Sequence, residues 1–256
     1  MIKGIYTAGS GMMLQMARQD VVANNLANVN TTGFKKSSAV ARAFPAMLMS
    51  RLGELDTSSE PPKPQKPVII GYLGTGACVD GIITDNSLGN LKQTYLATDL
   101  ALGTVDTYLV VETPNDIAYT RGGSLKINGD GLLTTNQGYP VLDDNYDYIY
   151  LEGEFAVDEM GYITDNGEEI ARLMVVRFDN QEELEKLGGS LLITDQEPEL
   201  VDVPEILSGY LEESNVVAVQ EMVTLINVVR SYEALQKVIQ SEDEALQTVL
   251  DEVGRI

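Results

Sequence analysis

The sequence predicts an α+β protein in which N-terminal and C-terminal helices form a coiled-coil-like helical domain, with a central all-β domain between them in the chain. Three observations predict it. Apolar residues recur at helical spacing near both ends, turn residues separate short apolar runs in the middle, and 256 residues can fill a sizeable core. We expect terminal helices in residues 1–35 and 209–256, a linker segment at 36–67 and a β domain at 68–208.

The N-terminal helix is predicted from an imperfect apolar stripe at intervals of three or four residues: Ile2, Ile5, Gly9, Met12, Met16, Gln19, Ala23 and Leu26. The stretch NNLANVNTTGFK (24–35) then places four asparagines where helices favour alanine, at about half a kcal/mol each. Two readings stay open. One is a frayed helix end with Gly33 as its C-cap; the other is a row of buried amides that fix the register of neighbouring subunits.

The middle of the chain reads as a linker followed by many short strands. SSEPPKPQKP (58–67) is proline-rich, which removes amide donors and holds the chain extended. LKINGDGLLTT places Asn128 to Gly131 between two strands, as in a hairpin. ARLMVVRF (171–178) reads as a buried strand, and Asp179 to Leu187 as one short helix.

The C-terminal helix has the stronger pattern. With Asn215 as its N-cap it would run for about 35 residues, roughly 50 Å. Only Glu242 interrupts its stripe, which consists of Leu225, Val228, Tyr232, Leu235, Ile239, Leu246, Val249, Val253 and Ile256. A stripe of this length is typical of a coiled-coil seam and has to find a partner.

Composition excludes several kinds of site. The chain has no histidine and a single cysteine, Cys78, which excludes an internal disulfide framework, Cys/His zinc sites and histidine-dependent nucleophilic pairs. The net charge is −22, and residues 1–51 carry +5, so the remainder carries −27, which argues against binding nucleic acid. No secretory signal and no membrane span is visible, so these tests alone predict a soluble, cytoplasmic protein. We predict no catalytic residue, cofactor, metal or small-molecule substrate.

Two motifs resemble known binding sites but lack a glycine that those sites need. In GTGACVDG, Val79 stands where a dinucleotide fingerprint needs its third glycine, so we expect a strand edge or bulge there. In DDNYDYIYLEGE, Asp143, Asn145, Asp147 and Glu154 have the spacing of a calcium loop. Tyr148 occupies the position at which that loop needs glycine, so we expect no calcium binding.

Both ends of the chain resemble the flagellar rod and hook protein family. The N-terminal signature is GIYTAGSGM with NNLANVNTTGFK, and the C-terminal signature is GYLEESNVVAVQEMVTLINVVRSYEALQKVI (209–239). LGNLKQT, DLAL, YTRGGSLKINGDGLLTTNQGYPVL and LEKLGG follow the family's order between them, so the resemblance covers nearly the whole chain. MIKGIYTA and RAFPAMLMSRL are closer to the rod members, including the proximal ones, than to the hook. The chain departs from the family at Gly103 to Tyr108, where members usually have a Gly–x–Gly–Phe–Phe turn.

The resemblance implies a structural subunit of the bacterial flagellar basal-body rod, not an enzyme. Such a subunit is exported by the flagellar export apparatus without a cleaved signal peptide. It polymerises helically with other copies and with neighbouring rod and hook proteins into a hollow shaft that transmits torque and encloses the export channel. The subunit-assembly residues would be Asn24, Asn25, Leu26, Asn28, Gly33, Phe34, Leu225, Tyr232, Leu235, Ile239 and Leu246. The alternatives are a secreted or surface-located, β-rich, adhesin-like structural protein, and an enzyme with convergent acids in the β domain.

Overall fold

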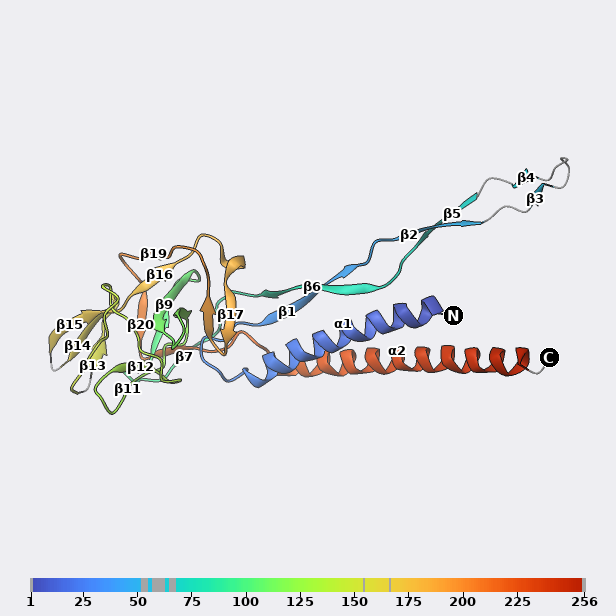
Figure 1. Cartoon of the computed structure of the whole chain (residues 1–256). Coiled ribbons are helices and arrows are strands. Elements are labelled where there is room, and N and C mark those ends of the chain that lie inside the picture. The colour runs from blue at the N-terminus through green and yellow to red at the C-terminus, as the bar shows by residue number, and fades with distance from the viewer. Residues whose placement is uncertain are drawn as a thin grey trace. The chain divides into compact units, whose positions relative to one another are not determined.

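The computed structural model describes residues 2–51, 55–56, 63–64, 68–153, 155–165 and 167–254. It confirms the α+β class, with a helix at each end of the chain and a β-rich region between them (Figure 1). The chain folds into two compact units, each assembled from separate stretches of sequence. Unit 1 contains residues 1–21, 39–82 and 223–256, and unit 2 contains residues 22–38 and 83–222.

The terminal helices are α1 (Ile2–Ala27) and α2 (Ala218–Val253), 26 and 36 residues long. The length predicted for α2 is confirmed, but its predicted N-cap is wrong. Asn215 lies before the helix. Its side chain accepts a hydrogen bond from the Lys36 amide and donates one to the Asp85 carbonyl. The first hydrogen bond of the helix runs from the Glu221 amide to the Val217 carbonyl. No helix in the part of the chain that the structure describes is both long and apolar enough to cross a membrane.

Helix α1 packs along α2 through small residues rather than through the predicted stripe. A Cβ built on Gly11 would lie 3.0 Å from Leu235 Cδ1, and one on Gly4 would lie 2.8 Å from Glu242 Oε1. Ala8 is buried, whereas Met16, a stripe residue, is 52% exposed. Leu14, Val21 and Val22 are buried as well. The stripe was wrong because it was placed one or two positions away from these residues along the helix.

The strands of unit 1 form two-stranded pairs: β1 (Ser37–Ala43) with β6 (Ala77–Thr84), β2 (Met47–Arg51) with β5 (Val68–Leu73), and β3 (Leu55–Asp56) with β4 (Lys63–Pro64). The expected linker at 36–67 therefore contains strands. Its prolines cluster near the end, and most of 58–67 lies outside the described residues, whereas residues 37–51 have only Pro45, which falls between β1 and β2. GTGACVDG forms the segment that connects β5 to β6 and the first residues of β6, so the motif lies at the start of a strand and no helix follows it.

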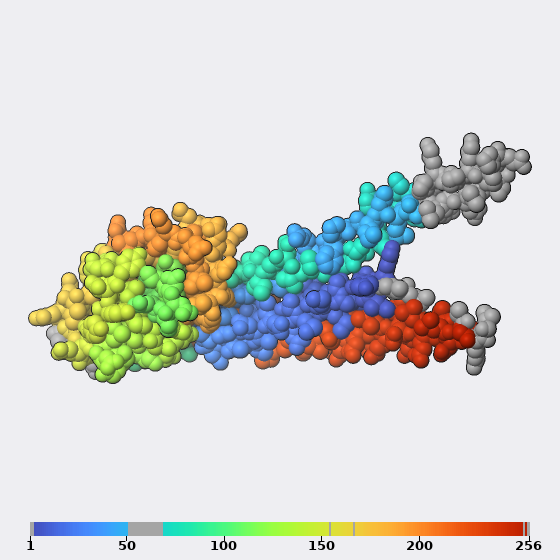
Figure 2. Space-filling model, viewed as in Figure 1, coloured from blue at the N-terminus to red at the C-terminus, as the bar shows by residue number. Residues whose placement is uncertain are grey.

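Helix α1, helix α2 and the β2–β5 pair are neighbours within unit 1. Figure 2 shows α1 in blue between α2 in red and the cyan strands. The Thr7 hydroxyl donates to the Thr75 carbonyl, and the Ala77 amide donates to the Ser10 hydroxyl. A hollow of about 520 Å³ remains among these elements, with Tyr6, Met47, Leu73, Leu235 and Val238 among its lining residues. Unit 1 therefore does not fill its own interior.

Unit 2 is built on a six-stranded sheet with the order β17-β18-β10-β9-β16-β19. These strands are β9 (Thr107–Glu112), β10 (Ile117–Thr120), β16 (Val175–Arg177), β17 (Glu185–Gly188), β18 (Leu191–Ile193) and β19 (Glu199–Leu200). Side chains of β9 alternate between two hydrophobic clusters, since Leu109 and Val111 belong to one and Tyr108 and Val110 to the other. Both faces of the sheet are therefore buried.

Smaller sheets complete unit 2: β13-β14-β15, β11-β12, β20-β8 and β21-β7. Their strands are β7 (Leu91–Gln93), β8 (Leu100–Leu102), β11 (Leu125–Ile127), β12 (Leu133–Thr135), β13 (Phe155–Val157), β14 (Tyr162–Asp165), β15 (Glu168–Arg172), β20 (Ile206–Ser208) and β21 (Tyr210–Glu212). The hairpin predicted at Asn128–Gly131 is confirmed by the pairing of β11 with β12.

Two sequence predictions in unit 2 need correction. The short helix expected at 179–187 is only a 3-10 turn, η1 (Gln181–Glu183), capped by Asn180 and followed at once by β17. The single strand expected at 171–178 is divided between the end of β15 and β16. The apolar run from Leu173 to Val176 is buried as expected, but a buried run does not by itself reveal where a strand breaks.

Candidate functional site

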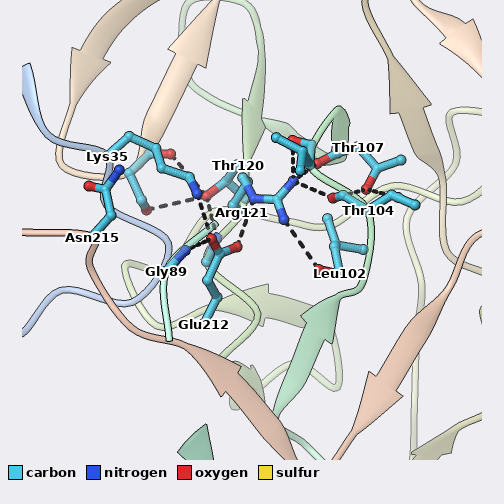
Figure 3. Close-up of polar contacts among 12 residues, drawn as sticks. Lys35, Gly89, Leu102, Thr104, Thr107, Thr120, Arg121, Glu212 and Asn215 are labelled. Atoms are coloured by element: carbon cyan, nitrogen blue, oxygen red, sulfur yellow. Dashed lines mark hydrogen bonds and ion pairs between the residues drawn. The ribbon is translucent and has the colours of Figure 1, made fainter. Parts of the chain in front are cut away.

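The two signature segments meet in unit 2 around the carboxylate of Glu212, which is 1% exposed. Its Oε1 accepts hydrogen bonds from Lys35 Nζ at 2.5 Å and from the Gly89 amide at 2.8 Å. Its Oε2 accepts one from Arg121 Nε at 2.7 Å (Figure 3). A buried carboxylate needs such partners to offset the loss of water. We call Lys35, Arg121 and Glu212 the junction triad.

Arg121, at the end of β10, is 2% exposed and is surrounded by backbone oxygens. Nη1 donates to the carbonyls of Thr104, Val105 and Thr107 at 2.9, 2.8 and 2.7 Å, and Nη2 donates to the Leu102 carbonyl at 3.2 Å. The turn that departs from the family pattern thus wraps the guanidinium. Because it does so through carbonyl groups, the unusual side chains at Gly103–Tyr108 do not prevent the contact.

Burial and charge set the protonation of the triad. Burial raises the pKa of Glu212, but the charge of Arg121, the hydrogen bonds from Lys35 and the Gly89 amide, and the charge of Lys35 outweigh it, so that this pKa lies below its ordinary value. Burial lowers the pKa of Lys35, and the bond to Glu212 offsets part of that effect. The Lys35 ammonium also donates to the Ser87 carbonyl at 2.6 Å. Glu212 is therefore held as a carboxylate between two cations.

Gly33 and Phe34 seat the N-terminal signature on unit 2. Gly33 has φ +69°, and a Cβ there would collide with the Arg121 backbone, so the position requires glycine. Its amide donates to the Glu212 carbonyl at 2.9 Å. Phe34 is 1% exposed, and Lys186 Nζ lies 4.2 Å from the centre of its ring.

Lys186 holds the same segment from β17. Its Nζ donates to the Lys35 carbonyl and to Ser37 Oγ. Burial lowers the pKa of Lys186 to about 8. An aromatic face and two oxygen acceptors give this ammonium the kind of environment that stabilises a partly buried cation.

Asn25, the completely buried member of the asparagine cluster, links three elements. Its Nδ2 donates to the Ser37 carbonyl at 2.8 Å and to Glu221 Oε2 at 3.2 Å, and its Oδ1 accepts from the Ser37 amide at 2.9 Å. Glu221, in the first turn of α2, also pairs with Lys36 at 2.6 Å. The Asn25 amide acts as both donor and acceptor, but its partners lie in its own chain. A role for the asparagines between subunits stays a prediction.

Gly33 is not the C-cap that the other reading required, because α1 ends at Ala27, well before it. The helix end is closed by Asn28 instead, whose Nδ2 donates to the Asn24 carbonyl at 2.9 Å. The left-handed backbone of Gly33 serves the close approach to Arg121.

Comparison with known proteins matches both ends and the middle of the chain to one family. Family models match at residues 5–35 (flagella basal body rod protein), 105–176 (flagellar hook protein FlgE/F/G D1 domain) and 207–252 (flagellar basal body rod FlgEFG protein C-terminal). The flagellar hook-basal body complex protein FlhO of Bacillus subtilis is 31% identical, with 100% of both chains covered. The flagellar basal-body rod protein FlgG of Borreliella burgdorferi is 32% identical, with 96% of this chain and 97% of that one covered. The rod protein FlgF of Rhizobium meliloti is 31% identical over 98% of each chain.

The chain belongs to the flagellar basal-body rod family. It is a structural subunit of the flagellar basal-body rod, as the sequence predicted. All three of these relatives are flagellar proteins, so the adhesin-like alternative gains no support.

The predicted assembly residues of this rod protein fall into two groups. Asn25, Gly33 and Phe34 are buried in the junction, and Leu26 and Asn28 are half-buried near it, whereas Asn24 is exposed. The residues on α2 are half-buried on the helix face that meets α1, where Leu235 contacts Gly11: Leu225, Tyr232, Leu235, Ile239 and Leu246. Their role between subunits stays a prediction.

Sequence reasoning missed the junction triad and Lys186. Arg121 lies in the motif YTR, Lys186 in LEKLGG, and Glu212 in GYLEESN, all of which carried the family resemblance. That these three motifs would meet was not readable from their spacing, since 91 residues separate Arg121 from Glu212. The available signal was charge, because each is an ionisable residue within a family motif. The sequence analysis had placed Lys186 in a short helix and Glu212 in the C-terminal helical segment, which hid their position in strands.

The rod protein shows no preformed metal site within the described ranges, where no group of three acidic or cysteine side chains is placed to hold an ion. In the calcium-like sequence, Asp143 Oδ1 accepts the amides of Asn145 at 2.9 Å and Asp147 at 2.8 Å. The loop thus closes on its own first carboxylate. Glu154 lies outside the described residues, and the absence of calcium binding stays a prediction.

Proposed function

We propose that this rod subunit polymerises helically, with other copies of itself and with neighbouring rod and hook proteins, into a hollow shaft that transmits torque and encloses the export channel. We also propose that it is secreted by the flagellar export apparatus without a cleaved signal peptide. The observation that carries the proposal is full-length similarity to rod proteins, including both terminal segments.

The assembly surface that we propose is the outward face of the two helices. On α2, Val219, Met222, Val223 and Ile226 lie on one side at helical spacing and are 71%, 49%, 53% and 51% exposed. This side is opposite the seam that meets α1. On α1, Tyr6, Met13 and Met16 are 74%, 73% and 52% exposed. A group of exposed apolar side chains of this size is typical of a surface that another protein covers.

The predicted assembly residues then divide by role. Asn24, which is exposed, would contact neighbours directly, and Leu26, which is half-buried, would do so with the part of its side chain that stays accessible. Asn25, Asn28, Gly33 and Phe34 would act indirectly by fixing where α1 ends. Leu225, Tyr232, Leu235, Ile239 and Leu246 would act by pairing α2 with α1, so that the two helices meet a neighbour as one body.

The strand pair β2–β5 is a second proposed contact. Met47, Leu48, Ile69, Ile70 and Tyr72 are each more than half exposed. A two-stranded pair has two open edges and no third strand to cover its faces, and such pairs are marginal alone in water. A neighbouring subunit would supply the missing cover.

We infer that the subunit has no catalytic role. The charged groups buried at the junction are saturated by one another and by backbone groups, which leaves no free acid or base there to act on a substrate. The inference is carried by the full-length similarity to rod proteins, and the paired charges of the junction are consistent with it.

The decisive experiment compares Ile226→Asp with Gln236→Glu, which adds the same charge at an exposed polar position of α2. Ile226 is 51% exposed, so covering the rest of its side chain against a neighbour contributes about 1 kcal/mol, and an unpaired carboxylate there adds a larger desolvation cost. We expect Ile226→Asp to abolish incorporation into basal bodies and motility, with the monomer's melting temperature unchanged. Normal motility with Ile226→Asp, or equal loss with Gln236→Glu, would contradict the proposed surface.

A further inference from the structure

The junction triad joins three parts of the chain that are distant in sequence. Lys35 belongs to the N-terminal signature, Glu212 to the C-terminal signature, and Arg121 to the strands between them. Lys35 and Glu212 are 177 residues apart, and Arg121 and Glu212 are 91 apart. Glu212 is the member that touches both others (Figure 3).

Each signature segment supplies ion-pair or hydrogen-bond partners for buried charged groups of the other. Without the C-terminal segment, the Lys35 ammonium and the Arg121 guanidinium would lose the carboxylate that they share, and both are almost completely buried. Asp85 also acts on Lys35, but only through space. Without the N-terminal segment, Glu212 would keep Arg121 but lose Lys35, and Glu221 would lose both Asn25 and Lys36.

Hydrogen bonds of the backbone also connect the two signature segments. The Gly33 amide donates to the Glu212 carbonyl at 2.9 Å, and the Lys36 amide donates to Asn215 Oδ1 at 2.7 Å. Removing either segment would leave buried donors or acceptors of the other without partners, which costs more than the bond itself is worth.

We propose that Glu212 is the shared counter-ion of a two-ended latch, so that the N-terminal and C-terminal signature segments seat on unit 2 together and neither seats stably alone. The latch makes the order of one end of the chain conditional on the presence of the other. In a chain that has not yet folded, or that lacks one end, neither of the segments that join α1 and α2 to unit 2 is then held in its final position. This coupling is a property of the monomer and does not depend on the proposed polymerisation.

The first test measures amide hydrogen exchange in the full-length protein. Glu212→Gln keeps the shape of the side chain and removes its charge, leaving two buried cations without a counter-ion. Breaking a buried pair in this way corresponds to a loss of at least about 100-fold in protection. We expect that loss at the Gly33 and Ser37 amides, with little change at Leu133 in the core. The matched control is Glu199→Gln, whose partner Arg177 also lies at 2.7 Å but whose side chain is 60% exposed; it should change protection less than threefold.

The second test probes the shared charge. If two cations share Glu212, then adding Lys35→Met to Glu212→Gln removes one of them and should restore at least about tenfold of the lost protection at Ser37. A double variant that is less protected than Glu212→Gln would overturn the shared counter-ion.

The third test is reciprocity. Gly33→Val unseats the N-terminal segment by collision with the Arg121 backbone and changes no charge. Coupling between the two ends then requires faster exchange at the far end, by at least about fivefold, at the Glu213 amide, which donates to the Asn90 carbonyl. Faster exchange at Ser37 with no change at Glu213 would overturn the latch. Equal acceleration at Leu133 would also overturn it, because the junction would then be part of one cooperative core.

Discussion

Unit 2 closes around two hydrophobic clusters and a paired set of buried charges, whereas unit 1 leaves large apolar side chains in contact with solvent. Leu133, Val141 and Ile163 in unit 2 are inaccessible to solvent, while Tyr72 and Tyr6 in unit 1 are 79% and 74% exposed. One chain thus contains a region with a fully buried core and a region whose paired strands and helices leave apolar faces exposed.

The difference shows where the protein's stability resides and where its contacts with other molecules remain to be made. Hydrophobic stabilisation follows the apolar area removed from water, so a monomer gains most of it in unit 2. Unit 1 gains the remainder only when something covers it. The comparison can be tested by substitutions that act on one unit and not on the other.

The largest expected effect is that of Arg121→Met in unit 2. The substitution leaves Glu212 with one cation and deprives four carbonyl oxygens of their donor. We expect a loss of about 3–5 kcal/mol in the free energy of unfolding, as for other broken buried pairs. Urea denaturation would measure it, with Arg177→Met as the exposed control. A loss below about 1 kcal/mol would mean that the junction contributes little to the stability of unit 2.

A somewhat smaller effect should separate the two units directly. Leu133→Ala opens a cavity in the larger cluster of unit 2 and should cost about 2–5 kcal/mol. Ile226→Ala in unit 1 removes a similar side chain that is half exposed and should change stability by less than about 0.5 kcal/mol. Thermal unfolding of both variants as monomers gives the comparison. Equal losses would show that the outward face of α2 is covered within the chain.

The pH dependence of unit 2 follows from Glu212. Its pKa is lowered on folding, so the stability that it contributes is present above the unfolded value of about 4.5 and is lost as pH falls through the folded value. We expect Glu212→Gln to be less stable near pH 7 but to lose less further stability between about pH 5 and pH 3. Urea midpoints at several pH values would show this. Parallel pH profiles for the two proteins would contradict it.

The smallest expected effect concerns Tyr108, whose hydroxyl is buried without a hydrogen-bond partner. Burial raises the pKa of Tyr108 to about 12, so the hydroxyl stays protonated at neutral pH. Tyr108→Phe removes an unpaired polar atom and keeps the ring packed against Phe178. We expect a gain of about 1 kcal/mol or no change in the free energy of unfolding, measured by urea denaturation. A loss above about 1 kcal/mol would indicate that the hydroxyl binds a buried water.

The sequence predicted those parts of the fold that depend on local pattern. The 3–4 spacing from Leu225 to Leu246 is the half-buried face of α2, and the turn at Asn128–Gly131 joins β11 to β12. Both depend on neighbours within a few residues. The buried side of α1 was not predicted, because the stripe was placed one or two positions away from Leu14, Val21 and Val22. Gly11, which lies against Leu235, adds a contact that an apolar pattern does not register.

The contacts of the junction were not predicted for a different reason. Asn25 was one of four asparagines for which the sequence left a frayed helix end and buried amides equally open. Its partners Ser37 and Glu221 come from two other elements. The same holds for Arg121, which finds Glu212 only after the sheet has formed. Pairings over such distances depend on topology, which a spacing pattern does not encode.

The carbonyl cage around Arg121 also makes this part of the molecule convenient for labelling. Because the guanidinium recognises backbone oxygens of residues 102–107, the side chains of Thr104 and Val105 are exposed and not required for the contact. Cys78 is the one native thiol, so Val105→Cys in a Cys78→Ser background would give a single attachment point. A fluorophore at that point would sit beside the latch without replacing any of its atoms and would report its opening in real time.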